Sequence, residues 1–171
     1  MESSNVLFCA PLQQLKDEHQ SLQGEMNHFY ELIEEIDFET GPTVLQLFTK
    51  LYELIFSFHP KLLAHSKLED DSLFPLMNQH PGEHNRTIEI MEFEHEKAEQ
   101  HLQDFLSEAA KAITSKKGDE HDLQAITVYA FQAYTTLTQH FVKEEKILFP
   151  MAESLLSKEE KVELAHLFER L

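Results

Sequence analysis

Residues 65–75 read HSKLEDDSLFP, and residues 140–150 read HFVKEEKILFP. Each segment contains a histidine, a glutamate four positions later and then the tripeptide Leu-Phe-Pro. Side chains four positions apart lie on one face of an α-helix, one turn from each other. Each copy therefore predicts a helix that presents an imidazole beside a carboxylate, and the chain contains this arrangement twice.

A second pair of histidines repeats in the same way. His95 follows His19 by nearly the interval that separates the two segments above, and each is preceded by a glutamate, Glu18 or Glu94. These two glutamates could lie behind the ligands or line a channel, but we expect them on solvated faces. The chain thus offers four imidazoles and two carboxylates in a repeated pattern.

Apolar residues mark out four long helices. They recur at alternating steps of three and four, which is the spacing of the buried face of a helix in a bundle. The last stripe continues through Glu144 to Ile147 and Met151. The four stripes cover residues 12–36, 48–76, 88–109 and 126–151.

Glycine and proline separate these helices. The expected breaks are Gly41-Pro42, His80-Pro81-Gly82 and Lys117-Gly118-Asp119. Short connections make neighbouring helices antiparallel. A further short helix is predicted over residues 158–171, with Ser157 as its N-cap. The predicted fold is all-α: an antiparallel up-down-up-down four-helix bundle with a short C-terminal fifth helix.

Pro60 lies inside the second apolar stripe, five residues before His65. Because the stripe continues in register beyond it, we expect a kink or a local opening of the helix there and not a chain reversal.

Composition limits the class of protein. A length of 171 residues suits a single domain over residues 1–171. A formal net charge of −17 argues against nucleic acid or an anionic membrane as a partner. Cys9 is the single cysteine, so the chain forms no internal disulfide. The sequence shows neither a signal peptide nor a long apolar span, and a cytoplasmic location is expected.

Six polar residues fall at positions that the stripes reserve for core side chains. Burying an imidazole or a carboxylate without compensating charge costs on the order of several kcal/mol for each group. A bound cation removes this cost. The candidate metal ligands are therefore His19, His65, Glu69, His95, His140 and Glu144.

The ligand types narrow the choice of metal. Zinc sites usually have four ligands and often include thiolates, whereas calcium and magnesium prefer oxygen donors. Mixed imidazole and carboxylate donors suit iron or manganese. Six ligands suit two ions that share Glu69 and Glu144, with two histidines on each ion. An oxo or hydroxo bridge between the ions leaves an octahedral ion one open position, where a small molecule would bind.

The doubled pattern resembles the hemerythrin-like domain, a four-helix bundle that holds a non-haem di-iron centre. The resemblance covers about residues 12–151 and implies two iron ions as the cofactor. Within the family, four histidines and two glutamates look most like the repair-of-iron-centres proteins. Oxygen-carrying hemerythrins have a further histidine where this chain has Glu99, and their last carboxylate would correspond to Glu145 in place of Glu144.

The resemblance leaves the role of Glu99 open. Glu99 could be a third carboxylate ligand at the open position. Alternatively, it accepts a hydrogen bond near the ligands or lies in solvent. The resemblance implies binding of, or response to, O2, NO or iron, in a stress or iron-homeostasis role. The alternatives are a di-iron oxidase or peroxidase-like enzyme and a sensor whose protein partner reads metal occupancy.

Overall fold

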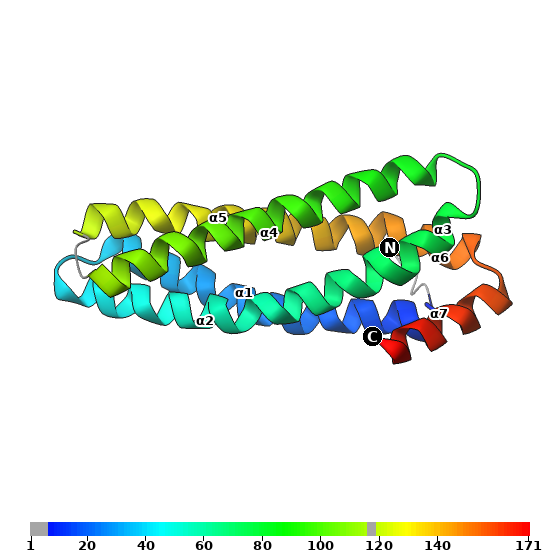
Figure 1. Ribbon diagram of the computed structural model, residues 1–171, viewed down its shortest axis with the longest axis horizontal. Helices are drawn as coiled ribbons and strands as arrows, with labels where there is room; N and C mark the ends of the chain where they lie inside the picture. The colour runs from blue at the N-terminus through cyan, green and yellow to red at the C-terminus, as the bar shows by residue number, and fades with distance from the viewer. Residues whose placement is uncertain (1–6, 116–118) are drawn as a thin grey trace, which may run out of the picture.

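The computed structural model describes residues 7–115 and 119–171. All regular structure in these ranges is helical (Figure 1). Part of the expected break at Lys117-Gly118 lies outside the described residues. The elements are α1 (Ala10–Phe38), α2 (Pro42–Leu68), η1 (Glu69–Leu73), α3 (Phe74–Asn78), α4 (His84–Ser115), α5 (Glu120–Lys143), η2 (Glu144–Leu148), α6 (Phe149–Leu155) and α7 (Lys158–Arg170).

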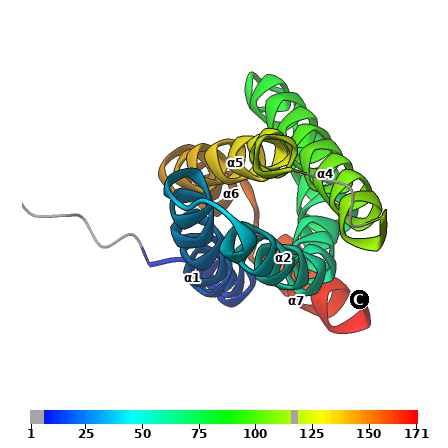
Figure 2. The same ribbon diagram turned by 90° about the vertical axis from the view of Figure 1, so that its left-hand side faces the viewer.

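Four long helices run alternately up and down around a common axis. Viewed along that axis, α1, α2, α4 and α5 form a ring (Figure 2). Neighbours in this ring are in contact, because α1 packs on α2, α2 on α4, α4 on α5 and α5 on α1. The predicted all-α fold with antiparallel up-down-up-down topology is confirmed.

The short fifth helix is also confirmed. α7 lies at the end of the bundle where α1 begins and contacts α1 and η1 (Figure 1). Ser157 caps it reciprocally: the Ser157 Oγ accepts the Glu160 N–H at 3.1 Å, and the Glu160 carboxylate accepts the Ser157 N–H at 3.0 Å. Leu164 and Phe168 bury one side of the helix against the bundle.

Two π-helical turns interrupt the long helices, and the sequence pattern did not reveal them. η1 begins at Glu69 and η2 at Glu144. The N–H of Phe74 donates to the carbonyl of Glu69, and the N–H of Phe149 donates to that of Glu144, five residues back in both cases. The next residue in each copy is proline, which has no N–H to offer the preceding turn. The wide turn thus accompanies the Leu-Phe-Pro repeat.

Each π-turn inserts one residue and rotates the next helical segment about its axis. The stripe of an unbroken helix placed Ile147 in the core, and that prediction is wrong: Ile147 is 51% exposed. Leu148 and Phe149 are fully buried in its place. By contrast, α2 runs through Pro60 as a continuous α-helix, and the change in helix geometry comes later, at Glu69.

The core consists of two apolar clusters. One fills the far half of the bundle and includes Leu22, Leu62 and Leu137. The other lies at the α7 end and includes Leu15 and Leu148. Along each long helix the predicted ligands fall between members of the two clusters, so the polar residues form a layer between two dry regions.

Candidate metal centre

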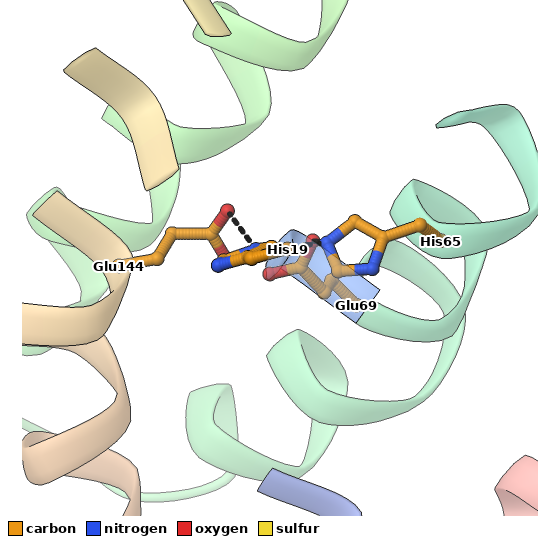
Figure 3. A group of neighbouring side chains, drawn as sticks. All are labelled: His19, His65, Glu69 and Glu144. Carbon is orange, nitrogen blue, oxygen red and sulfur yellow. Dashed lines mark hydrogen bonds and ion pairs between the residues drawn. The ribbon is translucent and has the colours of Figure 1, made fainter. Parts of the chain in front are cut away.

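Six buried or nearly buried polar side chains converge inside the bundle. They form two groups, and within each group one donor atom from every residue lies within 4.8 Å of the others. One group has two histidines from α1 and α2, the other has two from α4 and α5, and both groups contain the same two glutamates. The groups are His19, His65, Glu69 and Glu144 (Figure 3), and His95, His140, Glu69 and Glu144.

The two shared glutamates come from the π-turns. Glu69 opens η1 and Glu144 opens η2, and neither side chain is exposed to solvent. The sequence repeat therefore places one carboxylate on each side of the bundle axis. This gives the arrangement that two ions sharing two carboxylates require.

Short distances connect the members of each group. Glu69 Oε1 lies 3.1 Å from His65 Nε2 and 3.5 Å from His95 Nε2. Glu144 Oε1 lies 2.5 Å from His140 Nε2 and 3.6 Å from His19 Nε2. Each carboxylate thus faces one histidine from each group.

Most of these inward atoms lack hydrogen-bond partners among the described residues. Both oxygens of Glu69 and of Glu144 are buried and unpaired, as are Nε2 of His95 and of His140. Buried polar atoms in folded proteins are almost always satisfied. Imidazole nitrogens and carboxylate oxygens are donors that suit iron or manganese. A pair of such ions would satisfy these atoms, so the residues present fit the centre that the sequence predicts.

Comparison with known proteins agrees with this geometry. Residues 10–152 match the family model described as the hemerythrin HHE cation binding domain. The chain belongs to the hemerythrin HHE family. A search of curated proteins found no significant match. The match covers all four long helices and both π-turns, and so includes the whole candidate centre of this hemerythrin domain.

A second set of carboxylates contacts the outer nitrogens of the hemerythrin-type histidines. The Nδ1 of His65 lies 2.8 Å from Glu18 Oε1, and that of His95 lies 2.9 Å from Asp70 Oδ1. An Nδ1–H that donates to a carboxylate fixes the ring and its tautomer and turns the Nε2 lone pair inward. These carboxylates therefore orient the candidate ligands.

The other half of the centre has a similar arrangement. The Nδ1 of His140 donates to Glu94 Oε1 at 3.3 Å, and the second oxygen of Glu94 accepts from Lys143 at 2.7 Å. The expectation that Glu18 and Glu94 lie on solvated faces is therefore wrong for both. Asp70 was not singled out by the sequence. The available signal was adjacency, because each outer carboxylate is next in sequence to a candidate ligand.

Glu145 completes this outer set but makes the weakest contact. Its Oε2 lies 3.6 Å from His19 Nδ1, which is longer than a hydrogen bond. Its side chain is 32% exposed, whereas Glu144 is fully buried and belongs to both metal groups. The structure thus puts Glu144 among the candidate ligands and Glu145 outside them.

Opposing charges shift the pKa of three groups in the centre. Burial favours neutral imidazole, but Glu69 and Glu18 outweigh it and raise the pKa of His65 to about 9. The pKa of His95 is raised to about 9 as well, where burial is outweighed by the neighbouring carboxylates of Asp70 and Glu69. Burial likewise favours the neutral form of Glu69, yet His65 and His95 hold its pKa well below the usual range. In the metal-free centre, the positive charges of protonated His65 and His95 thus balance the carboxylates in place of metal ions.

The other histidine of each group behaves in the opposite way. Burial lowers the pKa of His19, and it also lowers that of His140 despite the hydrogen bond to Glu94. Each group therefore pairs one histidine that is protonated at neutral pH with one that is neutral. The two halves of the centre share this asymmetry.

Glu99 lies outside both metal groups. Its carboxylate contacts His59 Nε2 at 2.8 Å and accepts from Gln103 Nε2 at 2.6 Å. His59 is on α2 and Glu99 is on α4, so this contact joins two neighbouring helices. Of the seven residues proposed as ligands from the sequence, the structure brings six together and places Glu99 elsewhere.

No helix among the described residues combines the length and the apolar character that crossing a lipid bilayer requires.

Proposed function

We propose that this hemerythrin-family protein holds two iron ions and binds or responds to O2 or NO, in a cytoplasmic stress or iron-homeostasis role. The observation that carries the proposal is the pair of groups that share Glu69 and Glu144. Six donors arranged as two overlapping sets of four suit two ions better than one. Manganese is the competing metal, because it accepts the same donor types.

The protein orients the candidate ligands and keeps water away from them. Outer carboxylates hold three of the four histidines, and aromatic rings cover the centre. Phe141 stacks on His19 at 4.1 Å, and Phe74 stacks on His95 at 5.9 Å between ring centroids. Bound iron would supply redox chemistry and an exchangeable coordination position for a small molecule. Apolar surroundings restrict water at that position and favour a small, weakly polar ligand.

The ligand balance favours binding over oxidation chemistry. Oxygen donors stabilise higher oxidation states, and the proposed ligand set has two carboxylates against four imidazoles. The contact of Glu99 with His59 supports leaving Glu99 out of that set. A di-iron oxidase would be expected to use more carboxylates. Binding or sensing is therefore the function we propose first.

Metal content tests this proposal directly. Apoprotein is incubated anaerobically with excess Fe²⁺, desalted and analysed for metal, and absorption spectra are then recorded with and without O2 or NO. We expect two iron ions per chain and a spectrum that changes on addition of the gas. One ion per chain, or no spectral change with either gas, would contradict the proposal.

Two histidine variants provide the control. His140→Ala removes a candidate ligand and should lower the iron content. His166→Ala removes a histidine whose side chain is 65% exposed and should leave the content unchanged. Equal loss in both variants would indicate nonspecific binding of iron.

A further inference from the structure

The four candidate histidines are not held equally. His65, His95 and His140 each have an Nδ1 within hydrogen-bonding distance of a carboxylate. His19 does not: its Nδ1 is buried and has no hydrogen-bond partner among the described residues. In the described part of the chain, His19 is therefore the one candidate ligand whose outer nitrogen no carboxylate holds, and its one side-chain hydrogen bond joins its inner Nε2 to Nε2 of His65 at 3.0 Å.

Two phenylalanine rings stack on His19. Its ring lies between Phe141 at 4.1 Å and Phe149 at 5.5 Å, with interplanar angles of 20° and 24°. Stacked rings restrain tilting but supply no directional bond that opposes rotation in the plane of the stack. The side chain of His19 is only 3% exposed, so it closes the centre on the side of its Nδ1. Movement of the ring would open the centre on that side.

A groove between α1 and α5 lies on that side. It has a volume of about 620 Å³ and reaches His19 itself. Glu145 and Asp17 outnumber the cationic Lys16 in its lining. Gly24 leaves open space, since no atom lies within 4 Å of a Cβ placed there. The Oγ1 of Thr138 also lines the groove and is buried without a partner. Within the described chain, the groove thus has an excess of carboxylates and two unpaired polar atoms, His19 Nδ1 and Thr138 Oγ1, in its lining.

A second groove, between α1 and α2, reaches the same half of the centre but differs in charge. It has a volume of about 640 Å³ and ends at His65, which Glu18 holds at 2.8 Å. Lys61, Lys67 and Arg170 line it together with the anionic Glu18 and Glu25, and Lys61 pairs with Glu25 at 2.8 Å. These side chains leave a balance of one positive charge, against one negative charge in the groove between α1 and α5. A divalent cation is therefore attracted less by this lining, and it meets a ring held by a carboxylate at its end.

We propose that a divalent metal ion reaches the centre through the groove between α1 and α5, and that His19 is the ligand that moves to admit it. The inference rests on the proposed metal-binding function. Glu145, whose carboxylate lies 3.6 Å from His19 Nδ1, attracts the cation to this ring. Because no carboxylate fixes Nδ1, the ring turns aside once the cation replaces its contact with His65. The ion then meets the inward Nε2 of His19 and His65 and the oxygens of Glu69 and Glu144.

Filling each groove separately tests the route. Gly24→Phe places a ring in the groove between α1 and α5, and Ser21→Phe does the same in the other groove from an exposed position three residues earlier on α1. Both substitutions are compatible with the helix, because phenylalanine is a better helix former than glycine and similar to serine. Uptake of Co²⁺ by apoprotein is followed by stopped-flow absorption.

We expect Gly24→Phe to slow Co²⁺ uptake several-fold while the final stoichiometry stays that of the wild type, and Ser21→Phe to leave the rate unchanged. Slowing in Ser21→Phe alone, or in neither variant, would overturn the proposed route while leaving metal binding intact. Absence of Co²⁺ binding to the wild-type protein would instead contradict both the route and the proposed function. Thermal unfolding of both apoproteins verifies that they fold.

The role of His19 has its own test in two outer carboxylates of the same half-centre. Glu18→Gln weakens the hold on His65 and should lower Co²⁺ affinity by about 10- to 100-fold, as is typical when a partner of a metal-bound histidine is removed. Glu145→Gln should slow uptake with little change in affinity, because Glu145 makes no hydrogen bond to His19 that the substitution could remove. An affinity loss in Glu145→Gln as large as in Glu18→Gln would show that His19 is held like the others, and would overturn the proposal.

Discussion

Asp70 and His95 are joined by a 2.9 Å hydrogen bond between a carboxylate oxygen and Nδ1. Asp70 is the second residue of the π-turn, and Glu69 immediately before it faces the other nitrogen of the same ring at 3.5 Å. One turn of backbone therefore places a candidate ligand on the inner side of His95 and a hydrogen-bond acceptor on its outer side.

Replacing Asp70 with asparagine should weaken metal binding. The amide still fills the space, but it loses the charge that strengthens the hydrogen bond and raises the basicity of the ring. We expect about 10- to 100-fold lower metal affinity, measured by competition with a chromophoric chelator. Asp71→Asn is the matched control, because Asp71 is the exposed neighbour and should leave affinity unchanged. Equal effects in the two variants would indicate a general loss of negative charge.

The second π-turn makes a prediction about stability. Leu148 is fully buried, whereas the adjacent Ile147 is 51% exposed. Leu148→Ala should lower the free energy of unfolding by about 2–5 kcal/mol, because it leaves a cavity in the core. Ile147→Ala should change it by no more than about 0.5 kcal/mol. Chemical denaturation of both variants measures the difference, and the reverse order would indicate an unbroken α-helix through residues 144–148.

The fold and the convergence of six polar residues were accessible from the sequence because both depend on one periodic pattern. His19, His65, His95 and His140 occupy positions where apolar residues are expected, and antiparallel helices bring those positions to one level. Apolar periodicity also predicted α7, whose cap at Ser157 is local chemistry. These features need only a helix period and the order of the helices.

The sequence pattern did not reveal the π-turns or the outer carboxylates, because neither follows from helix periodicity. The extra residue at Glu144 shifts the buried face by one position, so an unbroken period misplaced Ile147. Glu18 and Glu94 lie beside the stripe, and their partners are on neighbouring helices. Only the rotation of one helix against the next decides whether such a side chain meets solvent or a histidine.

The raised pKa values of His65 and His95 predict how pH affects the metal-free protein. Both pKa values rise from 6.5 to about 9 on folding, so the protonated rings stabilise the fold below pH 6.5. That stabilisation is lost as pH rises through 9, because the folded protein then releases the protons it had retained. We expect the stability of apoprotein to fall between pH 6.5 and 9, measured by urea denaturation at several pH values.

The metal-bound protein should show a different pH response. A bound cation needs neutral imidazole, so metal and protons compete for the same rings. The apparent metal affinity should therefore rise over the pH window in which the apoprotein loses stability. Apoprotein whose stability stays constant or increases from pH 6.5 to 9 would contradict the proposed protonation of His65 and His95.

The contact between Glu99 and His59 predicts a structural role for Glu99. If the carboxylate only joins α4 to α2, Glu99→Ala and His59→Ala should each lower the free energy of unfolding by about 1 kcal/mol. The double variant should cost no more than either single one, because both remove the same interaction. Azide affinity of the iron-loaded, oxidised protein should match the wild type in all three. A change in azide affinity with Glu99→Ala but not with His59→Ala would instead place Glu99 at the metal ion.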